Sequence, residues 1–271
     1  MKAAVARPPR FYAQLLFTLL VCAFLIVPVV LSVMAGLSEN FFHGIKSGIT
    51  LRWVIEVWTL YRDTIFLSIG IALACLAVTL LLGVPAAYVL ARKQNRATRL
   101  VEELLVLPVA VPGLATALAL ILTYGQLRGF RASPAFILVG HVLFTLPFMV
   151  RSVLAVMSAV DLRTLEEGAA SLGASFRQRF FGIVLPNCRP GILAGALMVV
   201  TLSVGEFNMT WMLHTPLTKT LPVGLADSYA SMRLEIGSAY TILFFFMIIP
   251  LLVAMQLLAG EERGRTVRKK S

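Results

Sequence analysis

The sequence predicts an all-α polytopic membrane protein with six transmembrane helices, and three observations support this fold class. Of the 271 residues, 59% are hydrophobic and only 14% are charged, and the mean hydropathy is +0.87, whereas soluble domains carry about 25% charged residues. Six stretches are each apolar over the roughly 20 residues that a helix needs to cross a bilayer. Short polar segments separate these stretches. The composition therefore excludes an ordinary cytosolic enzyme, a disordered protein and a disulfide scaffold.

Hydropathy places the six spans within a single transmembrane domain of residues 1–271. They are expected at about residues 11–36, 64–90, 104–124, 135–157, 191–213 and 236–259. The first span is not a signal peptide, because its apolar core is far longer than the roughly 7–15 residues of a signal sequence. Prolines inside several spans, such as Pro85, Pro147 and Pro250, predict kinks, which a membrane bundle tolerates when neighbouring groups satisfy the freed carbonyl.

Lysine and arginine residues predict the orientation of the chain. Seventeen of them fall in the two tails and in the second-to-third and fourth-to-fifth loops, against seven in the other loops. Because positive residues concentrate on the cytoplasmic side, both termini are expected there. The net charge of +11 is then a topology signal facing anionic lipid heads of the bilayer, not a nucleic-acid surface. The tails contribute Lys2, Arg7, Arg10, Arg263, Arg265, Arg268, Lys269 and Lys270.

The cytoplasmic loop of residues 161–190 is predicted to hold two short helices. Thr164 can cap the first helix, with Glu167 three residues later completing a capping box. Leu165, Ala169 and Leu172 then share one face.

The second helix of this loop follows Gly173, a residue suited to a left-handed C-terminal cap. Ser175 and Gln178 predict another capping box, and Pro186 is expected to stop the helix. The result is a compact pair of helices projecting from the membrane, with small residues that let another protein approach closely.

The same loop resembles the EAA motif of permease subunits of binding-protein-dependent ABC importers. That motif reads Glu-Ala-Ala, three residues, Gly, nine residues, Ile, one residue, Leu-Pro, and the spacing here fits throughout. Gly168 departs from the family pattern, because alanine is usual at its position. The resemblance extends over most of the chain beyond Thr64, and overall likeness lies with the polyamine, iron(III), phosphonate and sulfate branch. The matching residues are Glu167, Gly168, Ala169, Gly173, Ile183, Leu185 and Pro186.

The resemblance implies a type I ABC importer permease-like bundle in a bacterial inner membrane. It implies that the loop docks on a cytoplasmic ABC ATPase subunit, present in two copies, and that ATP and Mg²⁺ bind there and no cofactor binds this chain. In agreement, the sequence lacks the Gly-x-x-x-x-Gly-Lys-Ser/Thr phosphate loop. A second permease subunit, identical or homologous, and a periplasmic solute-binding protein are the other implied partners. The chain itself is not expected to be an enzyme.

The fifth span holds the candidate translocation path or gate. Glu206 lies well inside the span, and ionisable groups at such depth usually serve function. It either contacts a cationic solute or has a gating or packing role, hydrogen-bonded to a neighbouring helix. The candidate residues for the path are Ser203, Glu206, Phe207, Asn208 and Trp211. The solute is expected to be a small polar or charged nutrient of the polyamine, aminoalkylphosphonate or iron(III) class.

The histidines do not predict a metal site. His43, His141 and His214 are far apart in sequence, and none forms the pair spacing typical of metal ligands. His141 is expected to make a hydrogen bond between helices. The remaining alternative for the whole chain is an ion-coupled secondary transporter that works without an ATPase, which would need its coupling residues within one chain.

Overall fold

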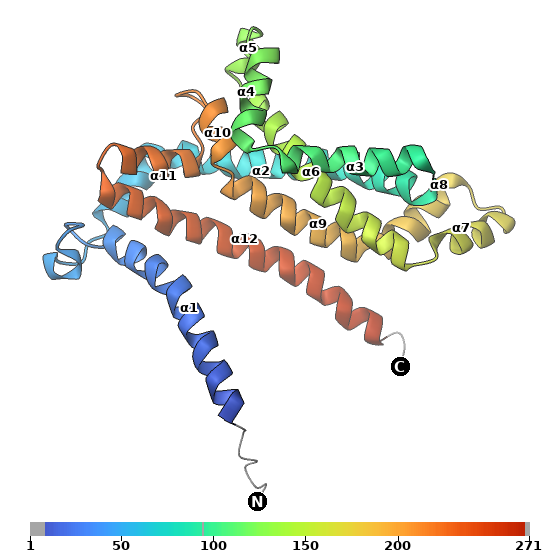
Figure 1. The fold of residues 1–271 in the computed structure, drawn as a ribbon, viewed down its shortest axis with the longest axis horizontal. Coiled ribbons are helices and arrows are strands. Elements are labelled where there is room, and N and C mark those ends of the chain that lie inside the picture. Colours follow the sequence, from blue (N-terminus) through green and yellow to red (C-terminus); the bar gives the residue numbers. More distant parts are fainter. Residues whose placement is uncertain (1–8, 94, 269–271) are drawn as a thin grey trace, which may run out of the picture. The chain divides into compact units, whose positions relative to one another are not determined.

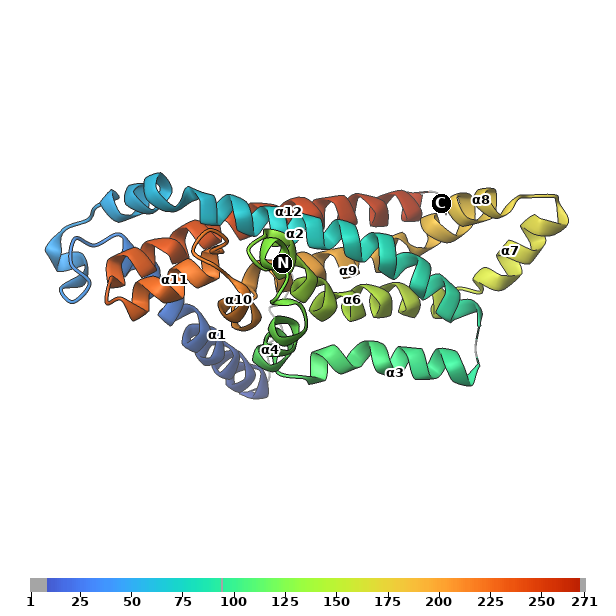
Figure 2. The same ribbon diagram turned by 90° about the horizontal axis from the view of Figure 1, so that it is seen from above.

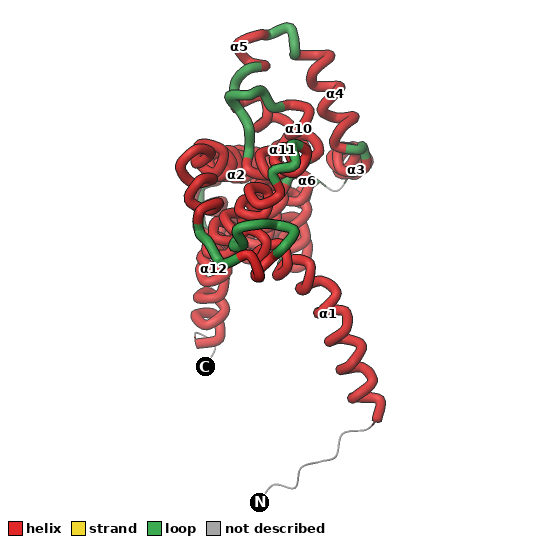
Figure 3. The backbone as a smooth tube through the Cα atoms, turned by 90° about the vertical axis from the view of Figure 1, so that its left-hand side faces the viewer, coloured by secondary structure: helices red, strands yellow, loops and turns green. Residues whose placement is uncertain are grey.

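The computed structural model describes residues 9–93 and 95–268. Within these ranges the chain is built from helices joined by short loops and contains no strand (Figure 1, Figure 3). Lys2, Arg7, Lys269 and Lys270, which support the predicted orientation, lie outside the described residues. The helices are α1 (Pro9–Gly36), η1 (Gly44–Ser47), α2 (Arg52–Arg92), α3 (Arg96–Ala110), α4 (Gly113–Tyr124), α5 (Arg128–Arg131), α6 (Pro134–Ala159), α7 (Leu162–Ser171), α8 (Phe176–Arg179), the π-helical turn η2 (Phe180–Val184), α9 (Leu185–Gly205), α10 (Asn208–Leu213), α11 (Leu221–Ala230) and α12 (Leu234–Arg268).

Five helices in the described part of the chain are long and apolar enough to cross a membrane, and the bent pair α3 and α4 passes the same test together, so that counting the pair as one span gives six. The all-α prediction with six spans is therefore confirmed. The five are Arg10–Gly36, Arg52–Arg92, Pro134–Ala159, Phe176–Gly205 and Leu234–Leu257.

The third span differs from the straight helix expected at 104–124. It begins earlier, at Arg96, where the Asn95 and Thr98 side chains form a capping box. It then bends by 101° between α3 and α4, and Figure 1 shows α4 turning away from α3. The bend lies at Val111 and Pro112. Val111 is extended, because a residue before proline avoids the helical conformation.

The described residues form two compact units. Those up to Tyr61 together with Leu225–Phe245 form the first, and Arg62–Gly224 together with the residues from Phe246 onward form the second. The candidate coupling loop and the candidate path both belong to the second unit.

Helices α6 and α9 lie along each other and form the centre of the second unit (Figure 2). Gly191 and Gly195 of α9 permit this close approach. A β-carbon built on Gly191 would lie 2.6 Å from the carbonyl oxygen of Ser152, and one on Gly195 would lie 2.8 Å from the sulfur of Met149. Two glycines four residues apart are a common device for tight helix packing in membranes.

In the first unit, the end of α1 packs against the start of α12. Gly36 makes the contact possible, because a β-carbon there would lie 2.7 Å from the backbone of Ser238. Nearby, Arg233 binds Glu56 at 2.6 Å and donates to the Tyr61 hydroxyl at 2.9 Å. From residue 12 to residue 31 every α1 side chain is exposed, and this apolar surface suits contact with lipid.

Candidate functional site

The first helix of the candidate coupling loop, α7, begins earlier than the sequence suggested. Asp161, not Thr164, is its cap: one carboxylate oxygen accepts the Thr164 backbone N–H at 3.2 Å and the other accepts the Thr164 hydroxyl at 2.6 Å. The predicted box between Thr164 and Glu167 is therefore wrong, and Glu167 instead accepts from Arg163 at 2.8 Å. The hydrogen bonds from the Thr164 hydroxyl and then its N–H lower the pKa of Asp161.

The turn between the two loop helices agrees with the sequence prediction. Gly173 has φ +84°, the left-handed conformation that favours glycine. Ser175 and Gln178 form the predicted capping box. Both features depend on residues three or fewer positions apart, so the local sequence was sufficient to predict them.

Pro186 does not end the second loop helix, contrary to the prediction. Through the π-helical turn Phe180–Val184 the chain continues directly into α9. Pro186 lies just after this π-helical turn, at the second residue of α9. The second loop helix is therefore helically continuous with the fifth span, from Phe176 to Gly205.

The outer surface of the loop is available to a partner. The Glu167 side chain is 59% exposed, Leu172 is 90% exposed, and a β-carbon on Gly168 would meet nothing within 4 Å. Pro186 is also exposed, while Ala169, Ile183 and Leu185 are half-buried. Figure 1 and Figure 2 show α7 and α8 projecting beyond the ends of α6 and α9. Within the loop, the predicted coupling residues thus form a mainly exposed surface.

Sequence reasoning missed Glu166, which is only 1% exposed. Its carboxylate accepts from the Tyr88 hydroxyl at 2.8 Å and lies 3.4 Å from an Arg92 nitrogen. The signal was available, because Glu166 follows Leu162 by four residues and so shares its face. Leu162 is itself buried in the core of the second unit.

The fifth span breaks where the path residues were predicted. Helix α9 ends at Gly205, and α10 starts at Asn208, so the span does not run unbroken over 191–213 as expected. The Glu206 carboxylate accepts from the backbone N–H groups of Met209 and Thr210, each at 2.8 Å. These bonds satisfy donors that the start of a helix leaves free, and they explain how the break is stabilised.

A buried histidine links this break to the neighbouring helix. His141 of α6 lies 2.8 Å from the Ser203 hydroxyl through Nδ1 and 2.8 Å from the Thr210 hydroxyl through Nε2. Because the Thr210 hydroxyl donates to Glu206 at 2.7 Å, we assign the proton of His141 to Nε2, and Nδ1 then accepts from Ser203. The prediction that His141 bonds between helices is confirmed.

The C-terminal end of α10 is also stabilised by a side chain from another segment. Arg131 donates to the carbonyl oxygen of Leu213 at 2.6 Å, and a cation at a helix C-terminus stabilises its dipole. With Glu206 at one end and Arg131 at the other, α10 has complementary charges at both ends. Met209 and Leu213 fill the core against α4 and α6.

The predicted path residues divide into two groups. Ser203 is buried and Glu206 is largely covered, and both make the hydrogen bonds described above. Asn208 and Trp211 are exposed, and the Phe207 ring lies 5.4 Å from that of Trp211. The structure therefore brings the first pair into the core and leaves the second pair on the surface.

The exposed pair continues a stripe along α9. Met198, Thr201 and Gly205 are exposed at helical spacing, and the Met198 sulfur lies 4.0 Å from the Ser152 hydroxyl of α6. A small glycine and polar Thr201 and Asn208 side chains are compatible with a surface that solute passes.

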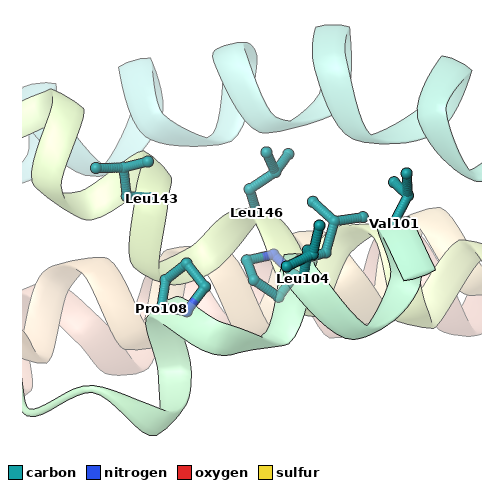
Figure 4. Close-up of a pocket in the computed structure, with 7 residues that line it drawn as sticks. Val101, Leu104, Pro108, Leu143 and Leu146 are labelled. Carbon is teal, nitrogen blue, oxygen red and sulfur yellow. The ribbon is translucent and has the colours of Figure 1, made fainter.

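A separate groove of about 240 Å³ lies between α3 and α6 (Figure 4). It offers a charged solute no hydrogen-bonding side chain, since its lining is entirely apolar. The lining residues are Val101, Leu104, Leu105, Pro108, Leu143, Leu146 and Pro147. Among the residues that the structure describes, no group of three or more His, Cys, Asp or Glu could hold a metal ion.

Residues 79–261 match the family of binding-protein-dependent transport system inner membrane components. The chain belongs to this family. The resemblance carried by the loop motif is therefore confirmed, and the chain is a permease subunit of ABC transport rather than an enzyme. Its family and its several apolar helices are those of a multi-pass inner-membrane protein.

Three similar proteins are named as permeases, and each aligns with this chain over nearly its whole length. The sulfate transport system permease protein CysW of Synechocystis sp. is 26% identical over 272 residues, covering 94% of this chain and 95% of that protein. The putrescine transport system permease protein PotI of Escherichia coli (strain K12) is 27% identical over 266 residues, covering 93% and 92%. A putative 2-aminoethylphosphonate transport system permease protein, PhnV of Salmonella typhimurium, is 24% identical over 256 residues, covering 92% and 95%.

Solved structures share the fold. A bacterial ABC transporter involved in the import of the acidic polysaccharide alginate matches with a TM-score of 0.67 at 17% identity, covering 94% of this chain and 95% of that one. The MetNI methionine ABC transporter in an inward-facing conformation matches with a TM-score of 0.61 at 16% identity, covering 80% and 98%. The prediction of a type I ABC importer permease-like fold is confirmed.

Proposed function

We propose that this permease couples solute import to ATP hydrolysis on a separate cytoplasmic ATPase, docked on the loop of residues 161–190. The observation that carries the proposal is the exposed surface around Glu167, Gly168 and Leu172. It lies on two capped helices, and the second is continuous with α9. Movement of such a loop would pass along this continuous helix into the fifth span. Two ATPase copies, which would bind the ATP and Mg²⁺, and a second permease subunit would complete the membrane assembly.

The proposed orientation places this loop and both termini in the cytoplasm. Its support is the excess of Lys and Arg on that side. A cysteine at exposed Leu172 is expected to react with a membrane-impermeant thiol reagent only in inverted vesicles. Reaction in intact cells would overturn the orientation.

Copurification tests the docking surface. The tagged chain, purified in mild detergent, is expected to retain an ATPase subunit, and Glu167→Lys should lose most of it. Glu103→Lys is the matched control, because Glu103 is an exposed acid on α3 outside the loop. Equal ATPase recovery with both variants would contradict docking at Glu167. Uptake by the chain alone in ATP-free vesicles would favour an ion-coupled secondary transporter.

The exposed stripe of α9 and α10 is proposed to line the translocation path. Solute would come from a periplasmic binding protein and pass Asn208 and Trp211 between two permease subunits. Asn208→Cys is expected to react with a charged thiol reagent, because a path admits water. Leu81→Cys, at a 74% exposed apolar position on α2, should face lipid and stay unreactive. Lack of reaction at Asn208 in every nucleotide state would refute the path assignment.

The solute is proposed to be a small charged nutrient. Its class follows the polyamine, aminoalkylphosphonate and iron(III) branch expected from the sequence, and relatives named for putrescine and 2-aminoethylphosphonate support it. Relatives named for sulfate and molybdenum are also similar, so binding measurements on the partner receptor should include oxyanions. Tight binding of an uncharged sugar by that receptor would contradict the proposal.

A further inference from the structure

Tyr88, near the end of α2, contacts both helices of the candidate coupling loop. Its hydroxyl donates to Glu166 of α7 at 2.8 Å. Its ring lies 5.4 Å from that of Phe180 and 6.1 Å from that of Phe176, and these two rings stack at 5.9 Å. Tyr88 is therefore the point where α2 meets the loop on both sides of its turn.

Arg92, one turn further along α2, completes this contact. Its guanidinium donates to the Tyr88 hydroxyl oxygen at 2.7 Å and lies 3.4 Å from Glu166. We call Tyr88, Arg92 and Glu166 the α2–α7 cluster. All three groups are connected, because the hydroxyl accepts from Arg92 and donates to Glu166.

The burial of Glu166 makes this cluster more than a surface ion pair. The Glu166 side chain is 1% exposed, against 38% for Arg92. A buried carboxylate is unfavourable unless charged and hydrogen-bonding groups compensate it, whereas an exposed pair such as Arg163 and Glu167 contributes little. Loss of contact with α2 would leave Glu166 uncompensated, so the loop and α2 are held together.

The two neighbouring acids of α7 therefore have opposite surroundings. Glu167 points outward and is 59% exposed, while Glu166 points to α2. On a helix, adjacent residues lie about 100° apart, so one acid can face a docked protein while the other faces the permease. Glu167 is therefore placed to contact a docked protein, and Glu166 is placed to connect the loop to α2.

We infer that the α2–α7 cluster transmits the movement of the docked loop to α2, so that the loop and the adjoining end of α2 move as one body. This inference rests on the proposed docking of an ATPase on the loop. Tyr88, Arg92 and Glu166 are positioning residues: they touch neither ATP nor solute. Their loss uncouples hydrolysis from import without releasing the ATPase subunit.

The test compares import with ATP consumption in the reconstituted complex of permease, ATPase and binding protein. Glu166→Gln removes the charge at nearly unchanged volume, and Tyr88→Phe removes the hydroxyl but keeps the ring contacts. Both variants should retain the ATPase subunit and import about ten-fold less solute per ATP hydrolysed. Glu166→Asp should recover part of the loss, and Glu103→Gln, outside the cluster, should match wild type.

Covalent replacement of the cluster supplies a second readout. In a background without Cys22, Cys75 and Cys188, a Tyr88→Cys, Glu166→Cys double variant should couple poorly. A short bifunctional thiol crosslinker should then restore the amount of solute imported per ATP hydrolysed, because the crosslink makes α2 and α7 move together.

The outcomes separate this inference from the proposed function. Wild-type coupling in both Glu166→Gln and Tyr88→Phe would overturn the inference, as would loss of import in step with loss of the bound ATPase. A crosslink that abolishes import would show that the loop and α2 must separate, and would also overturn it. Failure of the proposed function looks different: wild-type permease would hold no ATPase, or Glu167→Lys would leave its binding unchanged.

Discussion

Glu206 and Thr210 are joined twice across the first turn of α10. One carboxylate oxygen of Glu206 accepts both the backbone N–H of Thr210, at 2.8 Å, and its hydroxyl, at 2.7 Å. The other oxygen accepts the N–H of Met209. Both oxygens are thus engaged within the chain, which supports the packing role for Glu206 over contact with a cationic solute.

The first prediction concerns Glu206 and follows from these bonds. Glu206→Ala should lower the stability of the purified permease by about 1 kcal/mol, the usual effect of losing a helix cap. Glu206→Gln, which keeps one acceptor oxygen, should lose less and still support import. Thermal unfolding and uptake assays check both statements. An unchanged unfolding temperature together with a raised KM for a cationic solute would instead assign Glu206 to solute binding.

His141 provides the second prediction. His141→Phe leaves the Ser203 hydroxyl, in a residue only 4% exposed, without its histidine partner. Leaving a buried polar group unsatisfied costs about 1–3 kcal/mol, and we expect destabilisation of that size. Unfolding in increasing SDS measures it, with His43→Phe as the control at an exposed position. Equal stability of the two variants would mean that the His141 bonds contribute nothing.

The third prediction tests the close packing of α6 and α9. In Gly191→Ala the new β-carbon would lie 2.6 Å from the Ser152 carbonyl oxygen and 3.1 Å from the α-carbon of Val153. Backbone must shift, and such overpacking typically costs about 1–3 kcal/mol. Gly168→Ala is the matched control, because nothing lies within 4 Å and alanine is the better helix former. A Gly191→Ala protein as stable as Gly168→Ala would contradict this packing.

Asp161 gives the fourth prediction, which includes a pH dependence. Asp161→Ala should increase amide hydrogen exchange in the first turn of α7, whereas Asp161→Asn should retain most protection, since asparagine is also a good cap. Bonds from Thr164 lower the pKa of Asp161. Its stabilising effect is therefore fully present above the unfolded-state value of about 3.9 and is lost as the pH falls through the lowered pKa.

Between pH 8 and pH 5, then, the difference in protection factors between wild type and Asp161→Ala should stay constant. Mass spectrometry of the exchanged loop peptides measures this difference. A difference that shrinks already above pH 5 would show that another group controls the start of α7.

The sequence by itself determined the features that depend on local chemistry or on the bilayer. Hydropathy located the spans, because lipid demands an apolar stretch of nearly fixed length. The box between Ser175 and Gln178 and the left-handed Gly173 were predictable, since each involves neighbouring residues and a few backbone groups. The motif from Glu167 to Pro186 also predicted the family.

Tertiary structure decided the features that depend on which residue faces which helix. The spacing places Glu166 on the same face of α7 as Leu162, but only the packing of Tyr88 on α2 shows that this face buries a carboxylate. Similarly, His141 meets Ser203 and Thr210 only because α6 packs beside the end of α9 and the start of α10. A buried charge is stable only where distant segments supply its partners, and that information lies in the packing of helices rather than in the local sequence.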